Sequence, residues 1–551
     1  MMLCLLPGVL QGQSRIRERV YVSTDREVYV SGDAVWMSAY CVDAATGRLS
    51  SFSKTAYVEI HSPTGMVQTA KIALDHGRGG GRFTLPNTLP TGNYRLLAYT
   101  ALGASEEGFD PQVGARTLSV FNTFSSERVE GGVRVVDGAP AAAALPQAGG
   151  LAVSAAAGTG TARVTVTNRG AETVSFNLGV RHDDGIPAPQ GGRIADFVGG
   201  LRALPAARAF DPSVIPEYEG EIIRARVTGT DAEGMHAVLD RYAFISSPGD
   251  GENIYTAPIK EDGTATFFTS NIFGEQNMFL EIEDLDRSNI CHLEIVSPFL
   301  NLEPGDIPQL SLSPEYAEAL EMRGVAMQLE RNFNADTLYS ALPARRHQVF
   351  DPASCKTYIL DDYTRFPVMS DIFIEFIPEI RARQVDGKRE LQVLTMDQRG
   401  QFRFRQGVAL VLLDGVPVLD HEKILAYDPL LVERIEIYPD TYFVGIRGFS
   451  GIVNFVTYKG TLPSMTFEDN VRIVDFQGTS LPLAYTCIGV GDDYPDYRQT
   501  ILWHPLLTLA PGETVELECK TPLYTGRFEA VVEGLTDSGA PVSASTTFTL
   551  R

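Results

Sequence analysis

Residues 408–460 constrain the fold more than any other part of the chain, because apolar runs, turns and glycines alternate there at short intervals. Residues 408–413 are an unbroken apolar run that stops at Asp414-Gly415, the pattern of a buried strand ending in a tight turn. Ile435 and Ile437 alternate with polar residues and predict a second strand with one buried face. Three glycines then mark tight turns before a third strand over 452–458, namely Gly445, Gly448 and Gly451.

The order and spacing of these features resemble the plug domain of TonB-dependent outer-membrane receptors. The resemblance covers residues 350–462 and rests on DG-x-P, then DP-x-x-V-E-R-I-E-I, then YFVG-I-R-G-x-x-G-I-V-N-F-V-T. Asp428 is predicted to cap a short helix that begins at Pro429. The motif positions are Asp414, Gly415, Pro417, Ile435, Glu436, Gly445, Gly448, Gly451 and Asn454. We expect them to be structural rather than ligand-binding, because glycine positions answer to backbone geometry.

In such receptors the plug is followed by a large β-barrel whose strands are each about 9–11 residues long. The residues after Gly460, 461–551, are too few for a receptor barrel of about 22 strands. They also lack the aromatic-girdled, alternating hairpins of membrane strands. The sequence therefore predicts a plug-like domain whose barrel is a separate polypeptide.

Charge and hydropathy exclude several classes of function. The 551 residues carry 46 Lys and Arg against 69 Asp and Glu, a net charge of −23. Such acidity argues against nucleic-acid partners and against a polybasic membrane-surface role. The sequence contains no run of 18 or more apolar residues, so no transmembrane helix is predicted. Residues 1–13 are predicted to be a partial signal peptide without its charged start, so the true start codon is expected upstream.

The rest of the chain predicts β-sandwiches. The strings TDREVYVSGD, GRFTLP and LPTGNYRLLAYT resemble the macroglobulin-type sandwich, although Phe273 stands where thioester members carry the reactive cysteine. The predicted fold class is mostly β with a small α+β plug domain and tandem macroglobulin-like or Ig-like sandwiches. The expected segments are a macroglobulin-like sandwich (14–122), a linker (123–149), a β-sandwich (150–215), an Ig-like sandwich (216–299), a connector with a helix (300–349), the plug-like domain (350–462) and a C-terminal sandwich (463–551).

Two local patterns give sharper predictions. Alternating apolar residues on both sides of Asn168-Arg169-Gly170 predict a β-hairpin spanning 164–180. Residues 315–333 predict a helix opened by Pro314. Its expected core stripe is Ala319, Met322, Ala326, Leu329 and Phe333.

No catalytic, cofactor or metal site is predicted. The eight histidines are isolated, and the chain lacks HExxH, Cys-x-x-Cys, G-x-S-x-G and P-loop motifs. The glycine-rich segment 76–82 favours a flexible hairpin tip over an anion cradle, and the acidic stretches 183–185 and 492–496 favour solvated turns over calcium sites. Trp503 and His504 are predicted to anchor a sandwich. Cys487 and Cys519 lie in one predicted domain, but the sequence leaves their pairing open.

The resulting hypothesis is a non-catalytic periplasmic adaptor, associated with the outer membrane, that docks to and occludes a separately encoded β-barrel. The chain specifically resembles the plug-like subunits that are found with the type 9 secretion translocon. Other periplasmic envelope proteins are further expected partners, whereas nucleic acid is not. Tyr363, Arg365 and Phe366 are the candidate interface, because aromatic residues and arginine are enriched in binding hot spots. The alternatives are an envelope scaffold that binds a peptide or glycan, and a fragment of a TonB-dependent transporter.

Overall fold

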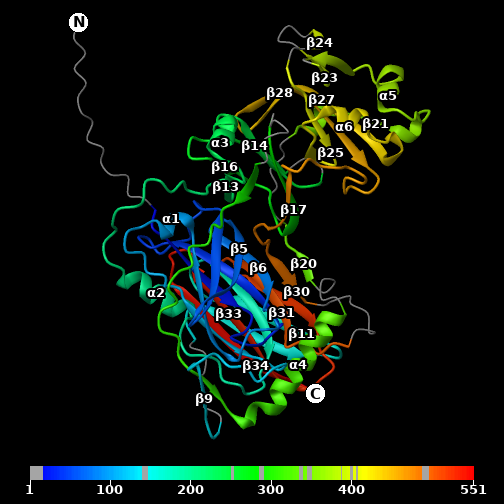
Figure 1. The fold of residues 1–551 in the computed structure, drawn as a ribbon. Coiled ribbons are helices and arrows are strands. Elements are labelled where there is room, and N and C mark those ends of the chain that lie inside the picture. Colours follow the sequence, from blue (N-terminus) through cyan, green and yellow to red (C-terminus); the bar gives the residue numbers. More distant parts are fainter. Residues whose placement is uncertain are drawn as a thin grey trace, which may run out of the picture. The chain divides into compact units, whose positions relative to one another are not determined.

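The computed structural model describes residues 16–138, 147–249, 253–283, 291–333, 339–343, 350–385, 387–396, 401–404, 407–486 and 495–551. The chain divides into two compact units (Figure 1). Unit 1 comprises Met1–Tyr218, Phe299–Ala344 and Thr479–Arg551, and unit 2 comprises Glu219–Pro298 and Arg345–Gly478. Both are built mainly from β-strands, which confirms the predicted fold class. Among the described helices, none combines the length and apolarity needed to cross a bilayer. The predicted signal peptide and Cys487 lie outside the described residues.

The first sandwich of unit 1 is one eight-stranded sheet folded over its own core. On β3, Met37 and Cys41 point into this core, whereas Tyr40 on the opposite face donates to Asn177 Oδ1 (3.0 Å) of the second sandwich. The strand is therefore buried on both faces. The strand order is β1 (Glu18–Thr24), β3 (Ala34–Asp43), β6 (Arg78–Thr84), β5 (Gly65–Asp75), β4 (Thr55–Ser62), β7 (Gly92–Tyr99), β8 (Arg116–Phe121) and β2 (Val28–Val30).

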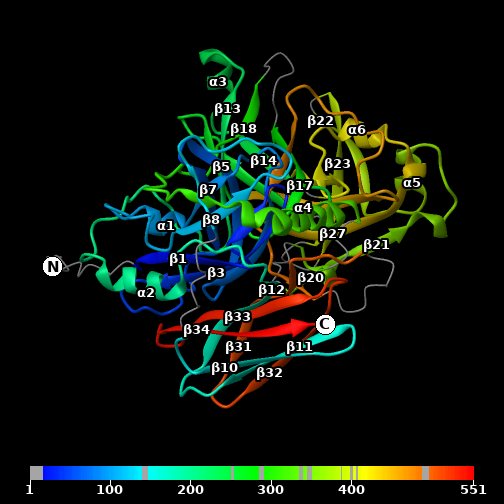
Figure 2. The ribbon, with the colours of Figure 1, turned by 90° about the horizontal axis from the view of Figure 1, so that it is seen from below.

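The second sandwich of unit 1 joins strands from opposite ends of the chain. Figure 2 shows the red strands of the C-terminal segment beside the cyan strands of the N-terminal half. Segments 150–215 and 463–551, which the sequence suggests as separate domains, thus share both sheets. One sheet is β10 (Leu151–Ala157), β11 (Thr161–Asn168) and β32 (Thr514–Lys520). The other is β20 (Tyr339–Ala341), β30 (Leu483–Tyr485), β31 (Thr500–Leu509), β12 (Val174–His182), β33 (Gly526–Thr536) and β34 (Pro541–Leu550).

The predicted hairpin over 164–180 was wrong, because β11 and β12 lie in different sheets. Both edges of β12 are taken by C-terminal strands, β31 on one side and β33 on the other. Asn168 shapes the crossing between the sheets. Its Oδ1 accepts from Gly170 N (2.9 Å) and its Nδ2 donates to Leu509 O (3.0 Å).

The predicted helix over 315–333 is present as a 3₁₀ turn (Pro314–Tyr316) followed by α4 (Ala317–Asn332). Its predicted core stripe was only partly right, since Met322 is 37% exposed and Phe333 is 48% exposed. The helix is instead turned so that Arg323 faces inward, where it forms a bidentate ion pair with Asp184 (2.6 and 3.0 Å) and donates to Val28 O (2.6 Å). The smaller elements of unit 1 are α1 (Ala101–Ala104), α2 (Ile194–Ala203) and the parallel pair β9 (Val133–Val135) and β19 (Leu310–Leu312).

Unit 2 contains a sandwich and an α+β domain. The sandwich packs one three-stranded sheet against a four-stranded sheet whose last strand, β29, comes from beyond residue 462. The first sheet is β16 (Thr264–Phe268), β13 (Ile222–Thr228) and β18 (His292–Ile295), and α3 is Ala232–Val238. The second is β15 (Ile254–Pro258), β14 (Tyr242–Ser246), β17 (Glu275–Ile282) and β29 (Arg472–Gln477).

The α+β domain, residues 350–462, is centred on a mixed five-stranded sheet in which β25 runs parallel to β28. One face packs against two short helices and a second sheet, and the other packs against Phe244 and Ile254 of the unit 2 sandwich. The sheet order is β21 (Lys356–Ile359), β27 (Val432–Val444), β28 (Arg447–Thr457), β25 (Leu410–Leu413) and β26 (Val416–Pro417). The covering elements are α5 (Met369–Glu375), α6 (His421–Leu425), β22 (Ile380–Val385), β23 (Lys388–Met396) and β24 (Phe402–Phe404).

Candidate interaction site

The turn between β25 and β26 is built by Asp414 and Gly415, which both have positive φ (48° and 81°). The buried Asp414 carboxylate accepts hydrogen bonds from Thr457 N (2.6 Å), Thr457 Oγ1 (2.7 Å) and Leu462 N (2.8 Å). Aspartate suits this position because it tolerates the left-handed region and offers several acceptor sites. One side chain thus ties the turn to the end of β28 and to the segment after it.

A second motif residue, Asn454, bridges the same turn to β27. Its Oδ1 accepts from Gly415 N (3.1 Å), and its Nδ2 donates to Glu436 Oε2 (3.0 Å). Asn454 is buried, so both groups of its amide are used inside the domain. Ile435 is fully buried in the core, and Pro417 lies on the short strand β26 opposite Leu412.

Two of the motif glycines are required by close packing. Gly445 (φ 58°) forms the turn between β27 and β28, and a Cβ there would lie 2.8 Å from Thr256 O. Gly451 (φ 87°) would place a Cβ 2.5 Å from the Val393 side chain. Gly448 lies within β28 and has no positive φ. The structure therefore gives these motif residues packing and turn contacts.

Arg365 fastens the loop before α5 to the rest of the α+β domain. Its Nε donates to Asp361 Oδ1 (3.0 Å), and its Nη1 donates to Val432 O (3.0 Å) at the start of β27. Tyr458, which follows β28, donates its hydroxyl to Asp361 Oδ2 (2.6 Å) and also contacts the Arg365 guanidinium. Arg365 therefore joins three chain segments, and part of its hydrogen-bonding capacity is used internally.

The two aromatic residues of the predicted interface have different environments. Tyr363 is exposed and stacks on Phe376, with ring centroids 4.2 Å apart and an interplanar angle of 1°. Phe366 is half-buried and packs against the core of the α+β domain. Tyr363 is thus exposed beside a stacked partner, whereas Phe366 lies against that partner, Phe376, on the side of the core.

Exposed apolar side chains lie around Arg365. Ile359 pairs opposite Arg434 at the end of β21, and Leu430 lies in the capped turn whose carbonyls bind Arg365. We define the Arg365 patch as Ile359 (47% exposed), Tyr363 (41%), Leu430 (56%) and Tyr458 (51%) together with Arg365. The α+β domain holds ten of the 23 large exposed apolar side chains in the described part of the chain, although it spans only a fifth of the sequence.

Leu430 and Tyr458 were missed by sequence reasoning. The signal for Leu430 lies in the string Asp428-Pro429-Leu430-Leu431, where Asp428 Oδ1 accepts from Leu430 N (2.9 Å) and starts a single 3₁₀ turn. Adjacent side chains in a 3₁₀ turn point about 120° apart, so a single turn at the surface tends to bury one leucine and expose the other. Leu431 packs against the core and Leu430 faces solvent.

Unit 1 also contains a buried ionic cluster of titratable groups around Glu27. Glu27 pairs with Arg116 (2.6 Å), Arg181 (2.5 Å) and Arg193 (2.7 Å), while Glu533 accepts from Tyr21 (3.0 Å). Burial raises the pKa of Glu27, but the Arg181, Arg193 and Arg116 guanidiniums overcome it and hold this pKa well below its ordinary value.

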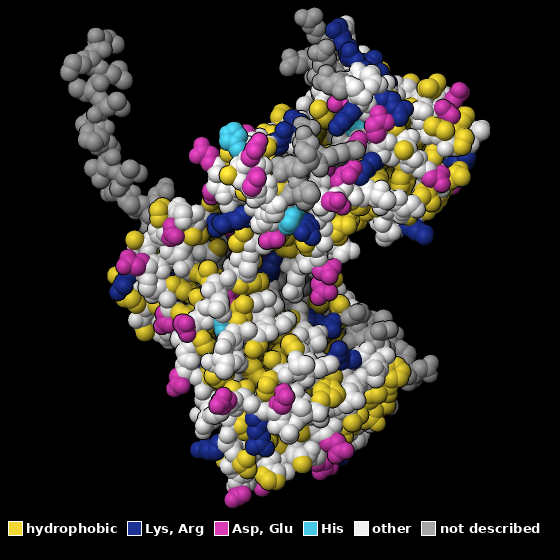
Figure 3. All heavy atoms as spheres, viewed as in Figure 1, with side chains coloured by type: hydrophobic (Ala, Val, Ile, Leu, Met, Phe, Trp, Pro, Cys, Tyr) yellow, Lys and Arg dark blue, Asp and Glu magenta, His cyan; other side chains and the backbone are white. Residues whose placement is uncertain are grey.

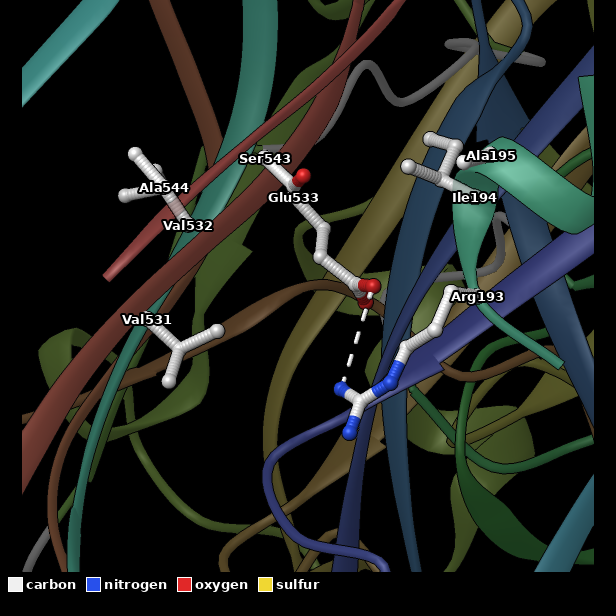
Figure 4. A pocket seen from close by; sticks show the side chains of 8 residues that line it. All are labelled: Arg193, Ile194, Ala195, Val531, Val532, Glu533, Ser543 and Ala544. Carbon is white, nitrogen blue, oxygen red and sulfur yellow. Dashed lines mark ion pairs between the residues drawn. The ribbon is translucent and has the colours of Figure 1, made fainter. Parts of the chain in front are cut away.

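Figure 4 shows the small cavity beside this cluster, with Arg193 and Glu533 facing each other 4.0 Å apart. The cavity volume of about 10 Å³ leaves room for at most one water molecule. Because the carboxylates of Glu27 and Glu533 are paired and no substrate fits, the cluster is a structural ion network.

The other residues that the sequence offers as possible binding residues make structural contacts. In segment 76–82 only His76 and Gly77 form a turn, whereas Gly79–Gly81 pack inside β6. Arg78 donates to Leu507 O (3.0 Å) and Phe176 O (2.9 Å), so it is not directed at an anion. Trp503 is 1% exposed within an aromatic cluster, as predicted.

The histidine, acidic and cysteine candidates also show no site chemistry. Burial, together with Arg78, lowers the pKa of His504 to about 4. Asp183 pairs with Arg527 and Asp184 with Arg323, and the described residues contain no cluster of three or more metal-ligating side chains. Cys519 is a buried free thiol, and its suggested partner Cys487 lies outside the described residues.

Neither a family model nor a curated protein sequence matches this chain. Similar solved structures include α2-macroglobulin from Escherichia coli activated by porcine elastase (8% identity, TM-score 0.24, covering 96% of this chain and 43% of that one). Methylamine-reacted α2-macroglobulin from Salmonella (9%, 0.24, 97% and 39%) and dimeric latent PorU from Porphyromonas gingivalis (7%, 0.14, 97% and 34%) are similar in the same way. The chain thus spans less than half the length of each. TM-scores of this size assign no fold family.

Proposed function

We propose that this protein is a non-catalytic periplasmic adaptor, associated with the outer membrane, whose α+β domain docks to a separately encoded outer-membrane β-barrel and occludes it. The observation that carries the proposal is the Arg365 patch, a set of ordered aromatic and aliphatic side chains exposed around a fixed arginine. Aromatic residues and arginine in such an arrangement are typical of interface hot spots.

The sequence resemblance to receptor plugs suggests the class of partner, an outer-membrane β-barrel. Thr457, which binds the motif residue Asp414, is followed directly by Tyr458 of the patch. The described residues after 462 complete the sandwiches of both units through β29 to β34. A plug-like domain with an exposed apolar end suits a partner barrel on another chain, and the type 9 secretion translocon is the partner we favour.

The patch supplies part of the free energy needed for docking. Full burial of a large apolar side chain contributes about 1.5–3 kcal/mol, so each half-exposed member of the patch would contribute about 1 kcal/mol on being covered. Four such contributions give about 4 kcal/mol, which equals the lower end of the cost of association, so the net affinity must come from further contacts around the patch. Occlusion would then be steric, because a folded domain would fill the aqueous lumen.

Site-specific photocrosslinking in the native envelope tests the proposal. A photoreactive residue at Leu430 is expected to crosslink an outer-membrane barrel protein, whereas the same residue at Phe268, equally exposed on β16 of the unit 2 sandwich, is not. With the captured barrel in a planar bilayer, the wild-type chain should lower its conductance and Leu430→Asp should not. Equal crosslinking at both sites would contradict docking through the patch. A soluble peptide or glycan as the sole crosslinked species would favour the scaffold alternative instead.

A further inference from the structure

The second sheet of the α+β domain carries a net positive charge, whereas the chain as a whole is acidic. Residues 380–405 contain seven Lys and Arg against three Asp and Glu, within a chain of net charge −23. Figure 3 shows Lys and Arg side chains gathered at the end of unit 2 where Figure 1 labels β23 and β24. A local charge reversal of this kind points to an anionic partner.

The register of the sheet places the basic and aromatic residues on one exposed face. Arg381 lies opposite Gln392, and Leu394 opposite Phe404, so alternation puts these four side chains on the same side. Ile380, Leu391 and Val393 on the other side are buried in the core of the domain. The exposed face therefore presents Arg381, Arg383, Lys388, Phe402 and Phe404.

Arg381 is held in place for recognition. Its guanidinium lies 4.1 Å from the centroid of the Phe404 ring, and its Nε and Nη2 both donate to Gln392 Oε1 (3.0 and 2.9 Å). Neither Arg381 nor Arg383 forms an ion pair with any residue that the structure describes. A stacked arginine loses little freedom when it binds a carboxylate in the planar, bidentate manner.

The same strand is an open sheet edge. β22 is the outer strand of the order β22-β23-β24, and Ala382 and Gln384 are exposed. Leu394 N donates to Glu379 O (2.8 Å), so hydrogen-bonded pairs alternate from that point and include Arg381 and Arg383. The backbone groups of Ala382 and Gln384 consequently point away from β23, toward solvent, where another strand can pair with them.

We propose that β22 binds an extended, acidic segment of a partner protein, which adds to the open edge and places alternate carboxylates beside Arg381 and Arg383. The side-chain period of two residues in a strand matches the spacing of the two arginines on one face. A lipid headgroup would also satisfy the charges, but it cannot use the open backbone edge. This site lies on a different sheet from the Arg365 patch and does not depend on it.

A labelled peptide of alternating threonine and glutamate is the probe, with fluorescence anisotropy of the full chain as the readout. Arg381→Ala/Arg383→Ala is expected to weaken binding about tenfold, since each exposed ion pair contributes roughly 0.2–1 kcal/mol and a stacked arginine lies at the upper end. The matched control is Arg224→Ala/Arg226→Ala, which removes two exposed arginines at the same spacing on β13 and should leave affinity unchanged.

A second probe keeps the test independent of any effect of the substitutions on folding. The same peptide methylated on every second backbone nitrogen is expected to bind wild-type protein about fivefold more weakly, because it cannot pair with the edge. A threonine-glutamine peptide should not bind. Equal loss in both double variants, equal affinity for the methylated peptide, or variant-sensitive binding to phosphatidylglycerol vesicles in place of the peptide would each overturn the proposal.

Discussion

Replacement of Asp414 by Asn is expected to destabilise unit 2 and to leave unit 1 unchanged. Asparagine tolerates the left-handed backbone of the turn and has nearly the same shape, so the substitution isolates the carboxylate. Its amide nitrogen must face at least one of the three donors, Thr457 N, Thr457 Oγ1 or Leu462 N, and the remaining bonds lose their charge. Hydrogen bonds to a charged group contribute about 1.5–3 kcal/mol each, so we expect a loss of about 3 kcal/mol.

The two units can be followed separately in this experiment. Both tryptophans, Trp36 and Trp503, belong to unit 1, so tryptophan fluorescence during urea unfolding reports that unit alone. Hydrogen exchange of the backbone amides in 410–416 and 452–458 reports the sheet that Asp414 holds. A loss of about 3 kcal/mol should accelerate exchange there roughly a hundredfold, while the fluorescence midpoint stays constant.

The control is the same substitution at Asp428, which caps the 3₁₀ turn through one bond to Leu430 N. Asparagine and aspartate are equally good at such caps, so Asp428→Asn should change stability by less than about 0.5 kcal/mol. Indistinguishable exchange in the two variants would refute the reasoning, because it would mean that the Asp414 carboxylate does not hold the sheet together.

Three further substitutions have distinct expected outcomes. Burial raises the pKa of Glu281 to about 8, so its carboxyl must take up a proton on folding at pH 7. Glu281→Gln should therefore stabilise unit 2 by about 2 kcal/mol at pH 7 and have no effect below pH 4. Thermal melts at the two pH values would reveal this difference. Burial lowers the pKa of His421 to about 4, so the stability that the neutral imidazole contributes to unit 2 is present above pH 6.5 and is lost as the pH falls toward 4. His421→Asn, whose Oδ1 can accept from Leu391 N, should make the stability of unit 2 less dependent on pH in this range. Glu27→Gln removes the shared partner of Arg116, Arg181 and Arg193 and should cost unit 1 about 3 kcal/mol, seen as a lower urea midpoint in tryptophan fluorescence.

Much of the α+β domain could be predicted from the sequence because its signals are local. The strand before Asp414, the cap at Asp428 and the buried Ile435 and Ile437 each depend on neighbours within a few residues, and each is confirmed. The turn at Asp414 and Gly415 is likewise encoded by the two residues that form it.

The errors arise where the partner is distant in the sequence. Alternation identified β11 and β12 as strands, but apart from β10 beside β11 their neighbours are β32, β31 and β33, more than 300 residues away. The stripe on α4 was assigned from hydrophobicity, which counts Arg323 as an outer residue, whereas Asp184 holds it inside. The Arg365 patch was half found, because composition singled out Tyr363 but only the fold brings Tyr458 to Asp361.

The position of β12 between β31 and β33 has a consequence for how the chain matures. Synthesis delivers β12 long before either neighbour, and until then both of its edges can pair with any other strand that is available. The central sheet of unit 2 has no such delay, because all of its strands lie within residues 356–457. We therefore expect chaperones to bind the early segment, and we expect products truncated before residue 500 to be degraded rapidly.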